Sequence, residues 1–480
     1  MQPRELFSGT EISTRGVEEI VITGLASDSR AVAPGYLFAA LDGVQHQGSL
    51  FVADAIARGA AAILSARPVD QSSVPVLVHD NPRRALALCA RNFFTTAPRY
   101  IAAVTGTNGK TSVANFLRHL WQAADRSAAS IGTLGVQHDQ RSVPLPHTTP
   151  DPIVLHSHMR DLYAEGVTHC VIEASSHGLD QCRLDGLHIQ LAGFTNLTHD
   201  HLDYHETEEA YFSAKARLFT HLLDGPAVIF VDHPMGQRLA RDVQDRGGRL
   251  ISVGTQNADF IIRQTARAPS GQSIMMQYAG ETRQVDVPLI GDFQVENIGV
   301  AAAMAVISGL SLAELALDDL PPPPGRMQLA GTTSSGAHVY IDYAHTPDAL
   351  LRVLQTARAH SAADVHVVFG CGGNRDQAKR PEMGAIADQW ADHIVITDDN
   401  PRHEDAASIR AMIRAACPSA VEIPDRRDAI HSALGRAQAH DMIVIAGKGH
   451  ETGQMIADTV LPFSDLDEVR AALATGVAHG

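Results

Sequence analysis

Residues 105–112 read TGTNGKTS and directly follow the apolar run IAAV. Triphosphate binding needs unobstructed backbone N–H groups, a lysine for the β- and γ-phosphate oxygens and a hydroxyl for Mg²⁺, all at a helix N-terminus. The sequence supplies these groups as Gly106, Gly109, Lys110 and Thr111. Val104 occupies the place of the first glycine of the strict pattern. The spacing therefore predicts a nucleotide-binding loop, and the alternative is an ordinary turn between a strand and a helix.

A second polar cluster, IEASSHGLDQCRL, covers residues 172–184. Glu173 ends an apolar run, where a carboxylate can hold Mg²⁺ through its oxygen atoms. An anionic substrate could be contacted by Ser175, Gln181 and Arg183. The alternative is a helix N-cap at Ser175 or Ser176, followed by scattered surface polar residues.

Three histidines, at positions 199, 201 and 205, lie in the segment NLTHDHLDYHETEEAYFSAKARLF. Their spacing differs from HExxH, and no partnering Cys or His motif accompanies them, so a zinc site is disfavoured. A single histidine that joins a Mg²⁺ shell fits the pattern better. Lys215, in the same segment, has the character of a solvated helix lysine.

The C-terminal third carries further charged clusters at the ends of apolar runs. Asp342 could orient a ribose hydroxyl or a metal bound to phosphate, and Arg375, Lys379 and Arg380 suit a phosphate or a carboxylate. The stretch TDDNPRHED, residues 397–405, places an arginine behind a proline among four acids. The alternative for each cluster is the charged rim of an α/β domain.

These clusters share one setting, since each follows a short run rich in Val and Ile. Such runs suit strands buried on both faces of a parallel sheet. The Ala- and Leu-rich stretches between them, such as residues 347–362, suit crossover helices. The sequence therefore predicts an α/β fold. Its ligands are expected beyond the carboxyl ends of the strands.

Two seams divide the chain. They are TTAPRY at 95–100 and the stiff proline run LPPPPGR at 320–326, which cannot lie inside a helix or a central strand. Residues 257–290 alternate more and carry turn signals at Ser270-Gly271 and Ala279-Gly280, so we expect antiparallel hairpins appended to the middle domain. The phosphate loop and the second set of cations fall in different domains, and a site built from both could close on its substrates and exclude water.

Composition narrows the possible partners. The 480 residues carry a formal net charge of −16, which argues against nucleic acid or an anionic membrane as the main partner. Five cysteines without a CxxC pair disfavour a disulfide framework and favour a reducing compartment. The N-terminus lacks an apolar h-region, and no stretch reaches the ~18 apolar residues of a membrane span. We expect a soluble cytoplasmic protein.

Ten motifs in this order resemble those of the Mur ligase family, and within it the type that adds 2,6-diaminopimelate. They are TGTNGKTS, EASSHGL, NLTHDHLDYH, YFSAKARLF, GRMQ, DYAHTPDAL, GCGGNRD, KRPEMG, DDNPRHED and AGKGHE. The resemblance runs from about residue 27 to residue 451. It implies a uridine-nucleotide-binding α/β domain (1–97), a central P-loop ATPase domain (98–321) and a C-terminal Rossmann-like domain that binds the amino acid (322–480).

The reaction implied by the resemblance joins meso-diaminopimelate to UDP-MurNAc-L-Ala-D-Glu at the expense of ATP, as a step of peptidoglycan precursor synthesis. ATP phosphorylates the side-chain carboxylate of the D-glutamate residue, and the amino group of the third amino acid attacks the acyl phosphate. A tetrahedral intermediate then releases phosphate. Mg²⁺ and Lys110 offset the charge that gathers. The enzyme is expected to be a monomer.

The resemblance also implies which residues bind ATP and the metal. The ATP site comprises Thr105, Gly106, Thr107, Asn108, Gly109, Lys110, Thr111, Asn297, Arg326, Asp342 and His345. The magnesium ligands are Thr111, Glu173, His201 and Lys215. Lys215 matches the lysine that is carbamylated to N6-carboxylysine, which turns a cation into an anionic metal ligand. The resemblance makes Lys110, Lys215 and His201 the catalytic residues.

Two further sites follow from the resemblance. The UDP-MurNAc-dipeptide site comprises Ser27, Ser29, Arg30, Gln45, His46, Thr148, Thr149, Ser175, Gln181 and Arg183. The diaminopimelate site comprises Arg380, Asp399, Asn400, Pro401, Arg402, Gly447 and Glu451. DNPR is the family's diaminopimelate signature, and Arg402 can form a two-pronged bond to the carboxylate that L-lysine lacks. Glu451 suits the ammonium group of the substrate.

The sequence departs from the family pattern at three places. Phe293-Gln294 replaces the usual Phe-Asn, His147 precedes the threonine pair where Asn is usual, and Ala406 stands near the place of a common proline. Three alternatives remain: a ligase that adds L-lysine, a nucleotide phosphohydrolase or kinase that uses the same loop, and a non-catalytic relative that binds a UDP-sugar.

Overall fold

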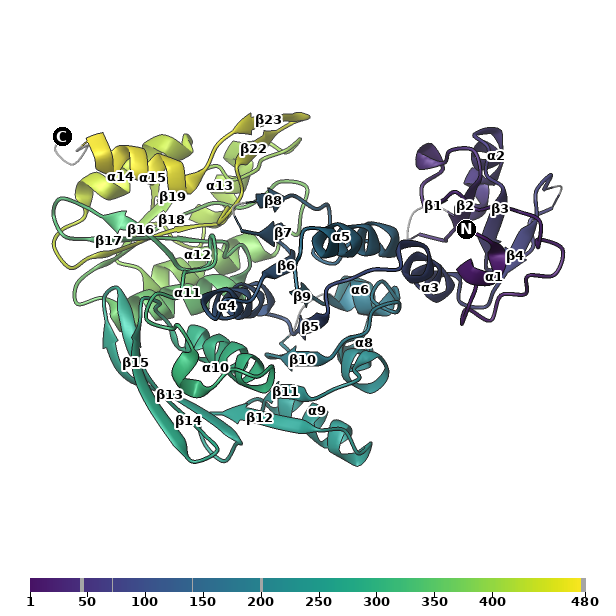
Figure 1. The fold of residues 1–480 in the computed structure, drawn as a ribbon. Helices are drawn as coiled ribbons and strands as arrows, with labels where there is room; N and C mark the ends of the chain where they lie inside the picture. The colour runs from purple at the N-terminus through teal and green to yellow at the C-terminus, as the bar shows by residue number, and fades with distance from the viewer. Residues whose placement is uncertain (44–46, 71, 140, 199–201, 476–480) are drawn as a thin grey trace. The chain divides into compact units, whose positions relative to one another are not determined.

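The structure is a computed structural model that describes residues 1–43, 47–70, 72–139, 141–198 and 202–475 (Figure 1). By their internal contacts the residues form two compact units. Unit 1 contains Met1–Ile261 and Asn297–Leu315, and unit 2 contains Ile262–Glu296 and Ala316–Gly480. No helix of the described residues is both long and apolar enough to cross a membrane.

The N-terminal part of unit 1 holds a four-stranded parallel sheet. Its strands, in spatial order, are β1 (Gly24–Ala26), β2 (Tyr36–Ala40), β3 (Ala62–Ser65) and β4 (Val76–Val78). The helices of this part are α1 (Pro3–Leu6), α2 (Val52–Ala57) and α3 (Pro82–Phe94). Asn81 caps α3 by accepting a hydrogen bond from the Arg84 N–H, and Thr95 ends the helix in a left-handed conformation. The helix thus ends at the start of residues 95–100, although the two compact units do not separate there.

The rest of unit 1 is built on a mostly parallel sheet. Its strands run in the order β12 (Leu250–Gly254), β11 (Ala227–Phe230), β10 (Leu191–Phe194), β5 (Tyr100–Thr105), β9 (His169–Glu173), β6 (Ala128–Gly132), β7 (Gly135–His138) and β8 (Arg141–Val143). Among these strands, the antiparallel pairs are β6 with β7 and β7 with β8. β5, β9 and β10 are buried almost throughout, as expected for strands covered on both faces.

Helices follow the strands of this sheet. They are α4 (Lys110–Ala123), α5 (Pro152–Ala164), α6 (Ser176–Asp180), α7 (Leu202–His205), α8 (Glu208–Arg217), α9 (Pro234–Asp245) and α10 (Asp292–Ile307), which begins in unit 2. α4 packs on β6 and β9, and α9 packs on β11 and β12 (Figure 1). The alternation of buried strands and helices confirms the predicted α/β fold.

The predicted hairpins are present. β13 (Phe260–Ala268), β14 (Gly271–Tyr278) and β15 (Glu281–Val287) are adjacent in the sheet, and Ala279 and Gly280 both have positive φ at the second turn. β13 starts in unit 1, but the remainder of the hairpin segment belongs to unit 2, whereas the sequence placed it with the middle domain.

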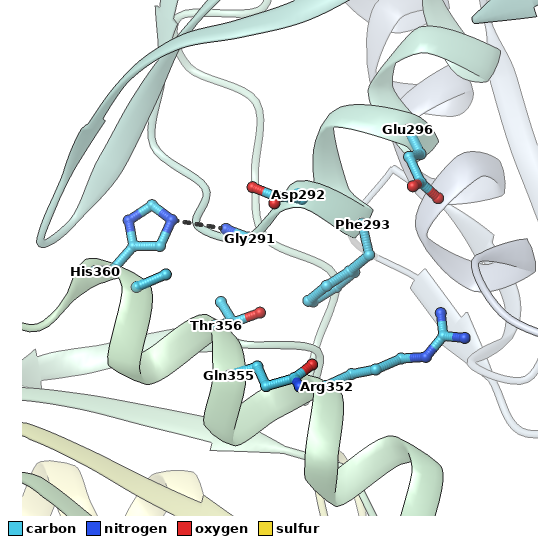
Figure 2. A pocket seen from close by; sticks show the side chains of 9 residues that line it. Gly291, Asp292, Phe293, Glu296, Arg352, Gln355, Thr356 and His360 are labelled. Carbon is cyan, nitrogen blue, oxygen red and sulfur yellow. Dashed lines mark hydrogen bonds between the residues drawn. The ribbon is translucent and has the colours of Figure 1, made fainter. Parts of the chain in front are cut away.

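Two buried contacts explain this placement. The Tyr340 hydroxyl donates to the carbonyl of Pro269 at 2.7 Å. The Nε2 atom of His360 accepts from the Gly291 N–H at 3.2 Å, and its Nδ1 lies 2.8 Å from the carbonyl of Ala268 (Figure 2). The imidazole therefore carries its proton on Nδ1, and it ties the last residue of β13 and the loop after β15 to one helix.

The sheet of unit 2 has six strands. Their order is β16 (Gln328–Thr332), β17 (His338–Asp342), β21 (Met442–Ala446), β18 (Val365–Phe369), β19 (His393–Ile396) and β20 (Val421–Glu422). All pairs are parallel except β16 with β17. The helices are α11 (Pro347–His360), α12 (Lys379–Trp390), α13 (Ala406–Arg414), α14 (Arg426–Arg436) and α15 (Asp465–Thr475), and a small hairpin joins β22 (Gly453–Ile456) to β23 (Thr459–Pro462).

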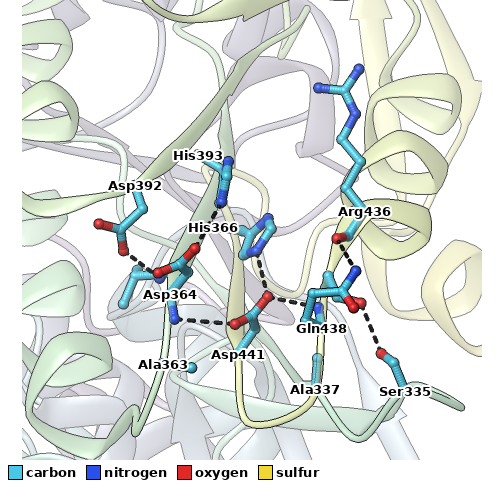
Figure 3. A network of polar contacts seen from close by, with 12 residues as sticks. Ser335, Ala337, Ala363, Asp364, His366, Asp392, His393, Arg436, Gln438 and Asp441 are labelled. Carbon is cyan, nitrogen blue, oxygen red and sulfur yellow. Dashed lines mark hydrogen bonds and ion pairs between the residues drawn. The ribbon is translucent and has the colours of Figure 1, made fainter.

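A polar network joins strands at the amino-terminal edge of this sheet (Figure 3). His366 Nε2 lies 2.9 Å from Asp441 Oδ2, and His393 Nε2 lies 3.1 Å from Asp364 Oδ2. The two imidazole rings stack with their centroids 4.3 Å apart. Asp441 also accepts the backbone N–H groups of Asp364 and Gln438. These contacts satisfy backbone groups where β18 and β21 begin, at the edge opposite the predicted ligand sites.

The network predicts an acid-sensitive contribution to stability. Burial lowers the pKa of His366 below its usual value of 6.5, although Asp441 opposes the shift. Because the folded state favours the neutral ring, stability is full above pH 6.5 and falls as the unfolded chain takes up the proton below that pH.

We therefore expect His366→Gln to flatten the fall in the thermal unfolding midpoint between pH 7 and pH 5. The same substitution at the exposed His221 is the control, because that ring lies on the surface. Parallel curves for the wild type and His366→Gln would contradict the assignment.

Candidate functional site

The glycine-rich loop lies between β5 and α4. Gly106 has a φ of 152°, and a Cβ there would meet Thr195 Oγ1 at 1.9 Å. Gly109, at a φ of 88°, precedes the first residue of α4, and a Cβ there would meet Asn297 Oδ1 at 2.1 Å. Side chains are excluded at both positions, so no Cβ of Gly106 or Gly109 covers the backbone at the helix N-terminus. The loop and Asn297, predicted to contact the nucleotide, are thereby adjacent.

The Lys110 side chain folds back onto this loop. Its Nζ donates to the carbonyls of Gly106 and Thr107, at 2.9 Å in each case. Two residues that were not among the predicted site residues also hold the loop. Asn196 accepts the Asn108 N–H with its side chain, and the Thr195 hydroxyl donates to the Asn108 carbonyl. Both residues directly follow β10, and Asn196 is the first residue of the motif NLTHDHLDYH, which was the signal for them.

Glu173 is the last residue of β9 and is 2% exposed. Its Oε2 accepts the hydroxyl of Thr111 at 2.8 Å, and its Oε1 accepts the backbone N–H of Thr133 at 2.9 Å. A carboxylate and a hydroxyl, both predicted as magnesium ligands, therefore lie within hydrogen-bonding distance. Oxygen atoms of this kind suit Mg²⁺.

The residues predicted to bind the muramoyl dipeptide form one connected cluster. Thr148 Oγ1 lies 3.1 Å from Thr133 Oγ1, and the Thr149 hydroxyl donates to the Glu173 carbonyl at 2.7 Å. Thr149 Oγ1 also lies 2.9 Å from Ser175 Oγ. The structure thus brings the HTTP motif and the end of β9 together.

Gln181 and Arg183 complete this cluster. Arg183 Nη1 donates to the carbonyl of Thr149 and its Nη2 donates to Gln181 Oε1. Burial lowers the pKa of the Arg183 guanidinium. Ser175 also caps α6 by accepting the Gly178 N–H, so the interpretation of Ser175 as an N-cap is confirmed, whereas its contact with substrate stays a prediction.

Lys215 is fully enclosed on α8 and is 1% exposed. Its Nζ donates to the carbonyl of Gly106 at 2.8 Å and lies 4.6 Å from the centroid of the Tyr211 ring. The expectation from the residues alone, a solvated helix lysine, is wrong. The side chain instead reaches the nucleotide-binding loop.

Part of the predicted metal shell lies outside the described residues, because His201 is not among them. Within the described ranges, no group of three His, Cys, Asp or Glu side chains could hold a metal ion. The zinc interpretation therefore gains no support from these ranges.

The N-terminal candidates are only partly described, since Gln45 and His46 also fall outside the described residues. Ser27 donates through its hydroxyl to Asp151 Oδ2 at 2.7 Å. Ser29 is buried in a short 3₁₀ turn, and the exposed Arg30 pairs with Asp28 at 2.6 Å. The Arg30 side chain is therefore accessible to a ligand at the protein surface.

In unit 2, Asp342 ends β17 and is buried. Its carboxylate accepts the N–H groups of Met327 and Ala344 at 2.7 and 2.8 Å. Burial raises the pKa of Asp342 to about 6, with Arg326 opposing the shift. The guanidinium of Arg326 lies 4.8 Å from the centroid of the Tyr343 ring, and the Tyr343 carbonyl lies 2.9 Å from His345 Nδ1. The three predicted nucleotide contacts of this unit therefore share one strand end.

Two loops of unit 2 bring predicted diaminopimelate residues together. Asn400, after β19, donates from Nδ2 to Glu451 Oε2 at 3.0 Å. Gly447, after β21, has a φ of 116°, and its N–H donates to the carbonyl of Asp342. A Cβ on Gly447 would lie 3.5 Å from Asp399 Oδ2. Burial raises the pKa of Asp399.

Arg402 occupies a strained position in this loop. It has a φ of 52°, which is uncommon for a residue other than glycine, asparagine or aspartate. Its backbone forms a bridge to Ile456 of the small hairpin. Its Nη1 donates to the carbonyl of Gly373 at 3.0 Å, and the buried Pro401 precedes it. Strain of this kind persists where surrounding contacts fix the backbone.

Arg380 differs from the expectation that it faces the substrate. It is 0% exposed, and its two Nη atoms donate to the two oxygens of Glu404 at 2.6 and 2.8 Å. Its charge is therefore already compensated by an acid of the run TDDNPRHED.

The other acids of that run have partners too. Asp398 pairs with Arg410, Asp399 lies 3.6 Å from Lys448, and Asp405 caps α13 by accepting the Ser408 N–H. The interpretation of these acids as a solvated rim is wrong for Asp398, Asp399 and Glu404, which are at least partly buried, whereas Asp405 is exposed.

A separate cavity of about 210 Å³ lies in unit 2 between α11 and the loop that opens α10 (Figure 2). None of the predicted site residues lines it. Its walls are Gly291, Asp292, Phe293, Glu296, Arg352, Gln355, Thr356, Ala359 and His360.

Comparison with known proteins gives three family matches along the chain. Residues 21–94 match the description "Mur ligase family, catalytic domain", residues 104–305 match "Mur ligase middle domain", and residues 325–449 match "Mur ligase, glutamate ligase domain". The chain belongs to the Mur ligase family.

Relatives of this Mur ligase are similar over nearly their whole length. A UDP-N-acetylmuramoyl-L-alanyl-D-glutamate--2,6-diaminopimelate ligase of Mesorhizobium japonicum is 47% identical over 98% of this chain and 99% of its own. One of a Chelativorans species is 49% identical over 95% of both chains. A solved structure of an enzyme with this name covers 95% of both chains, with 36% identity and a TM-score of 0.72.

The Arg380–Glu404 pair of this Mur ligase generates a prediction about stability. Arg380 holds the pKa of the Glu404 carboxyl at about 2, assisted by the Asn374 N–H. Because the folded pKa is below the unfolded value of 4.5, the stabilisation is complete above pH 4.5 and is lost as pH falls from 4.5 to about 2.

Glu404→Gln should therefore lower the thermal unfolding midpoint at pH 7, and its difference from the wild type should shrink below pH 4.5. Glu209→Gln is the matched control, because Glu209 forms the same two-pronged bond to Arg238 but in solvent. Equal effects of the two substitutions at pH 7 would refute the structural role of Glu404.

Proposed function

We propose that this Mur ligase adds meso-diaminopimelate to UDP-MurNAc-L-Ala-D-Glu with hydrolysis of ATP to ADP and phosphate. The similarity to ligases of that name, over almost the whole chain, supports the reaction. The choice of amino acid is supported by Arg402, which forms no ion pair with the described residues.

Diaminopimelate and L-lysine differ by one carboxylate on the far carbon, so discrimination needs a cation that is not already paired with an acid. Arg380 does not meet this requirement, because both of its Nη atoms bind Glu404. Arg402 meets it, because it forms no ion pair with the described residues and its Nη1 donates only to the neutral carbonyl of Gly373. Arg402 is thus the cation of the DNPR turn that can receive the distal carboxylate.

The first chemical step is transfer of the γ-phosphoryl group to the side-chain carboxylate of the D-glutamate residue. The N–H groups at the N-terminus of α4 bind the phosphates, whereas those of Thr107 and Asn108 are held by Asn196. Lys110 Nζ, which donates to two loop carbonyls, supplies positive charge for the charge that develops. A carboxylate is a poor electrophile, and phosphorylation gives it a leaving group.

In the second step the amino group of diaminopimelate attacks the carbonyl carbon of the acyl phosphate. The C–N bond forms, the tetrahedral intermediate collapses, and the C–O bond to phosphate breaks while the amine loses a proton. Arg402 and Asn400 orient the amino acid through its distal end, and Glu451 receives its ammonium group. Correct placement of the two reactants supplies much of the rate.

Mg²⁺ would supply positive charge beside the phosphates. Thr111 and Glu173 would hold it, since they present a hydroxyl and a carboxylate within 2.8 Å of each other, and His201 would join them. Lys215, enclosed beside the Gly106 carbonyl, would contribute as the carbamate N6-carboxylysine, which is anionic. We further propose that Ser27, Ser29, Arg30, Gln45 and His46 hold the uridine nucleotide and that the enzyme acts as a cytoplasmic monomer.

A single assay separates this function from its rivals. Phosphate release from ATP is measured with UDP-MurNAc-L-Ala-D-Glu and either meso-diaminopimelate or L-lysine. We expect release to be at least ~30-fold faster with diaminopimelate, because one charge-assisted contact contributes ~2 kcal/mol or more. Release without any amino acid would indicate a phosphohydrolase, equal rates would exclude the assigned specificity, and no release would indicate a binding protein.

Arg402→Ala tests the carboxylate contact itself. We expect the KM for diaminopimelate to rise ~30-fold or more, since the paired charge is lost, while the KM for ATP changes little. Arg427→Ala, which removes a surface arginine of the same unit, is the control. If the KM for diaminopimelate is unchanged in Arg402→Ala, Arg402 is not the recognising cation.

A further inference from the structure

Lysine is used sparingly in this chain. It occurs at four positions, 110, 215, 379 and 448, among 38 lysines and arginines. The first two lie in or against the nucleotide-binding loop. Arginine provides almost every surface cation instead. A lysine in such a sequence marks a place where a compact ammonium with three donors is needed, because a planar guanidinium fits different geometry. Lys448 is the member of this set that has no role so far.

Lys448 lies directly after Gly447 and is 0% exposed. Its Nζ lies 3.2 Å from Asn400 Oδ1, 3.4 Å from Glu451 Oε2 and 3.6 Å from Asp399 Oδ1. One buried ammonium group therefore reaches three residues of the diaminopimelate site. These residues come from two different loops, after β19 and after β21.

These contacts fix the orientation of the Asn400 amide. Oδ1 of Asn400 accepts from Lys448 and also from the Met455 N–H at 2.8 Å. Both of these donors point at the oxygen, so the NH₂ group must occupy the other position. There it donates to Glu451 Oε2 at 3.0 Å. A flipped amide would place its NH₂ against two donors, so Lys448 and the Met455 N–H together select one orientation.

The same contacts orient Glu451. Its Oε2 takes the hydrogen bonds from Asn400 and Lys448, and its Oε1 accepts none from the described residues. The second oxygen is thus available to a substrate ammonium group. If Lys448 were removed, the negative charges of Asp399 and Glu451 would lose one compensating cation. Arg426 could not replace it, since Arg426 is already bound to Asp465. Two carboxylates with too few cations would repel each other and move apart.

We propose that Lys448 is a positioning residue for the amino-acid substrate: it locks the Asn400 amide and the Glu451 carboxylate in the orientations that receive diaminopimelate. This inference rests on the proposed function. It assigns Lys448 no contact with the substrate and no part in phosphoryl transfer. Its loss should therefore weaken binding of one substrate selectively.

The test is Lys448→Met, which keeps the length of the side chain and removes the ammonium. We expect the KM for diaminopimelate to rise at least ~30-fold, while the KM values for ATP and UDP-MurNAc-L-Ala-D-Glu stay within about threefold. Lys448→Arg should not restore the KM, because the guanidinium is too large for a fully enclosed site. Arg427→Met, which removes an exposed cation of the same unit, should behave as wild type.

A double substitution separates positioning from a general loss of structure. If Lys448 acts through Glu451, the effects of Lys448→Met and Glu451→Gln on the KM for diaminopimelate will be clearly less than additive. Thermal unfolding in the presence of each ligand gives a second measure. The shift caused by ATP should persist in Lys448→Met, whereas the shift caused by diaminopimelate should be lost.

The outcomes distinguish the inference from the function on which it rests. A wild-type protein without diaminopimelate-dependent phosphate release overturns both. An active wild type with an unchanged KM in Lys448→Met overturns the positioning role alone. Equal rises in all three KM values, loss of both ligand-induced shifts or additive effects with Glu451→Gln also overturn it, because they indicate a structural role.

Discussion

Charge buried at the ends of strands must be compensated within a few ångströms, and this requirement shapes both units of the protein. An ionised side chain removed from water costs several kcal/mol unless a partner replaces the solvent. Glu173 is compensated by the Thr111 hydroxyl and by a backbone N–H group. Lys215 is satisfied by the Gly106 carbonyl, and Arg426 by Asp465. Each compensating contact also fixes a loop, so the elements that hold the site in place also compensate its buried charges.

The sequence allowed the strands and their polar ends to be predicted, because both depend on local pattern. Buried runs such as the one before Thr105 have no polar face, and only a parallel sheet covered on both sides suits them. The turn at Ala279-Gly280 could also be predicted from local sequence, because only a few residue types adopt positive φ readily. The nucleotide-binding loop combined both signals, and it lies where predicted.

The pairings between loops could not be predicted in this way. Nothing in the run TDDNPRHED shows that Glu404 meets Arg380, because the two residues are 24 positions apart and come from different strand ends. The same is true of Lys448 and Asn400, and of Tyr340 and Pro269, which draw the hairpin segment into unit 2. Strand order decides which loops become neighbours, and β21 lies between β17 and β18 although it is formed later in the chain.

Compensation also determines which charges remain for a ligand. A buried cation that already holds a carboxylate gains little from a second one, since the ligand must first displace the partner. Arg380 is in that state and so stabilises the fold. Arg402 donates to a neutral carbonyl, and its charge is offset by no described residue. In the proposed function, specificity for a substrate with one more carboxylate then depends on Arg402, which forms no ion pair with the described residues and has a strained φ of 52° beside its bridge to Ile456.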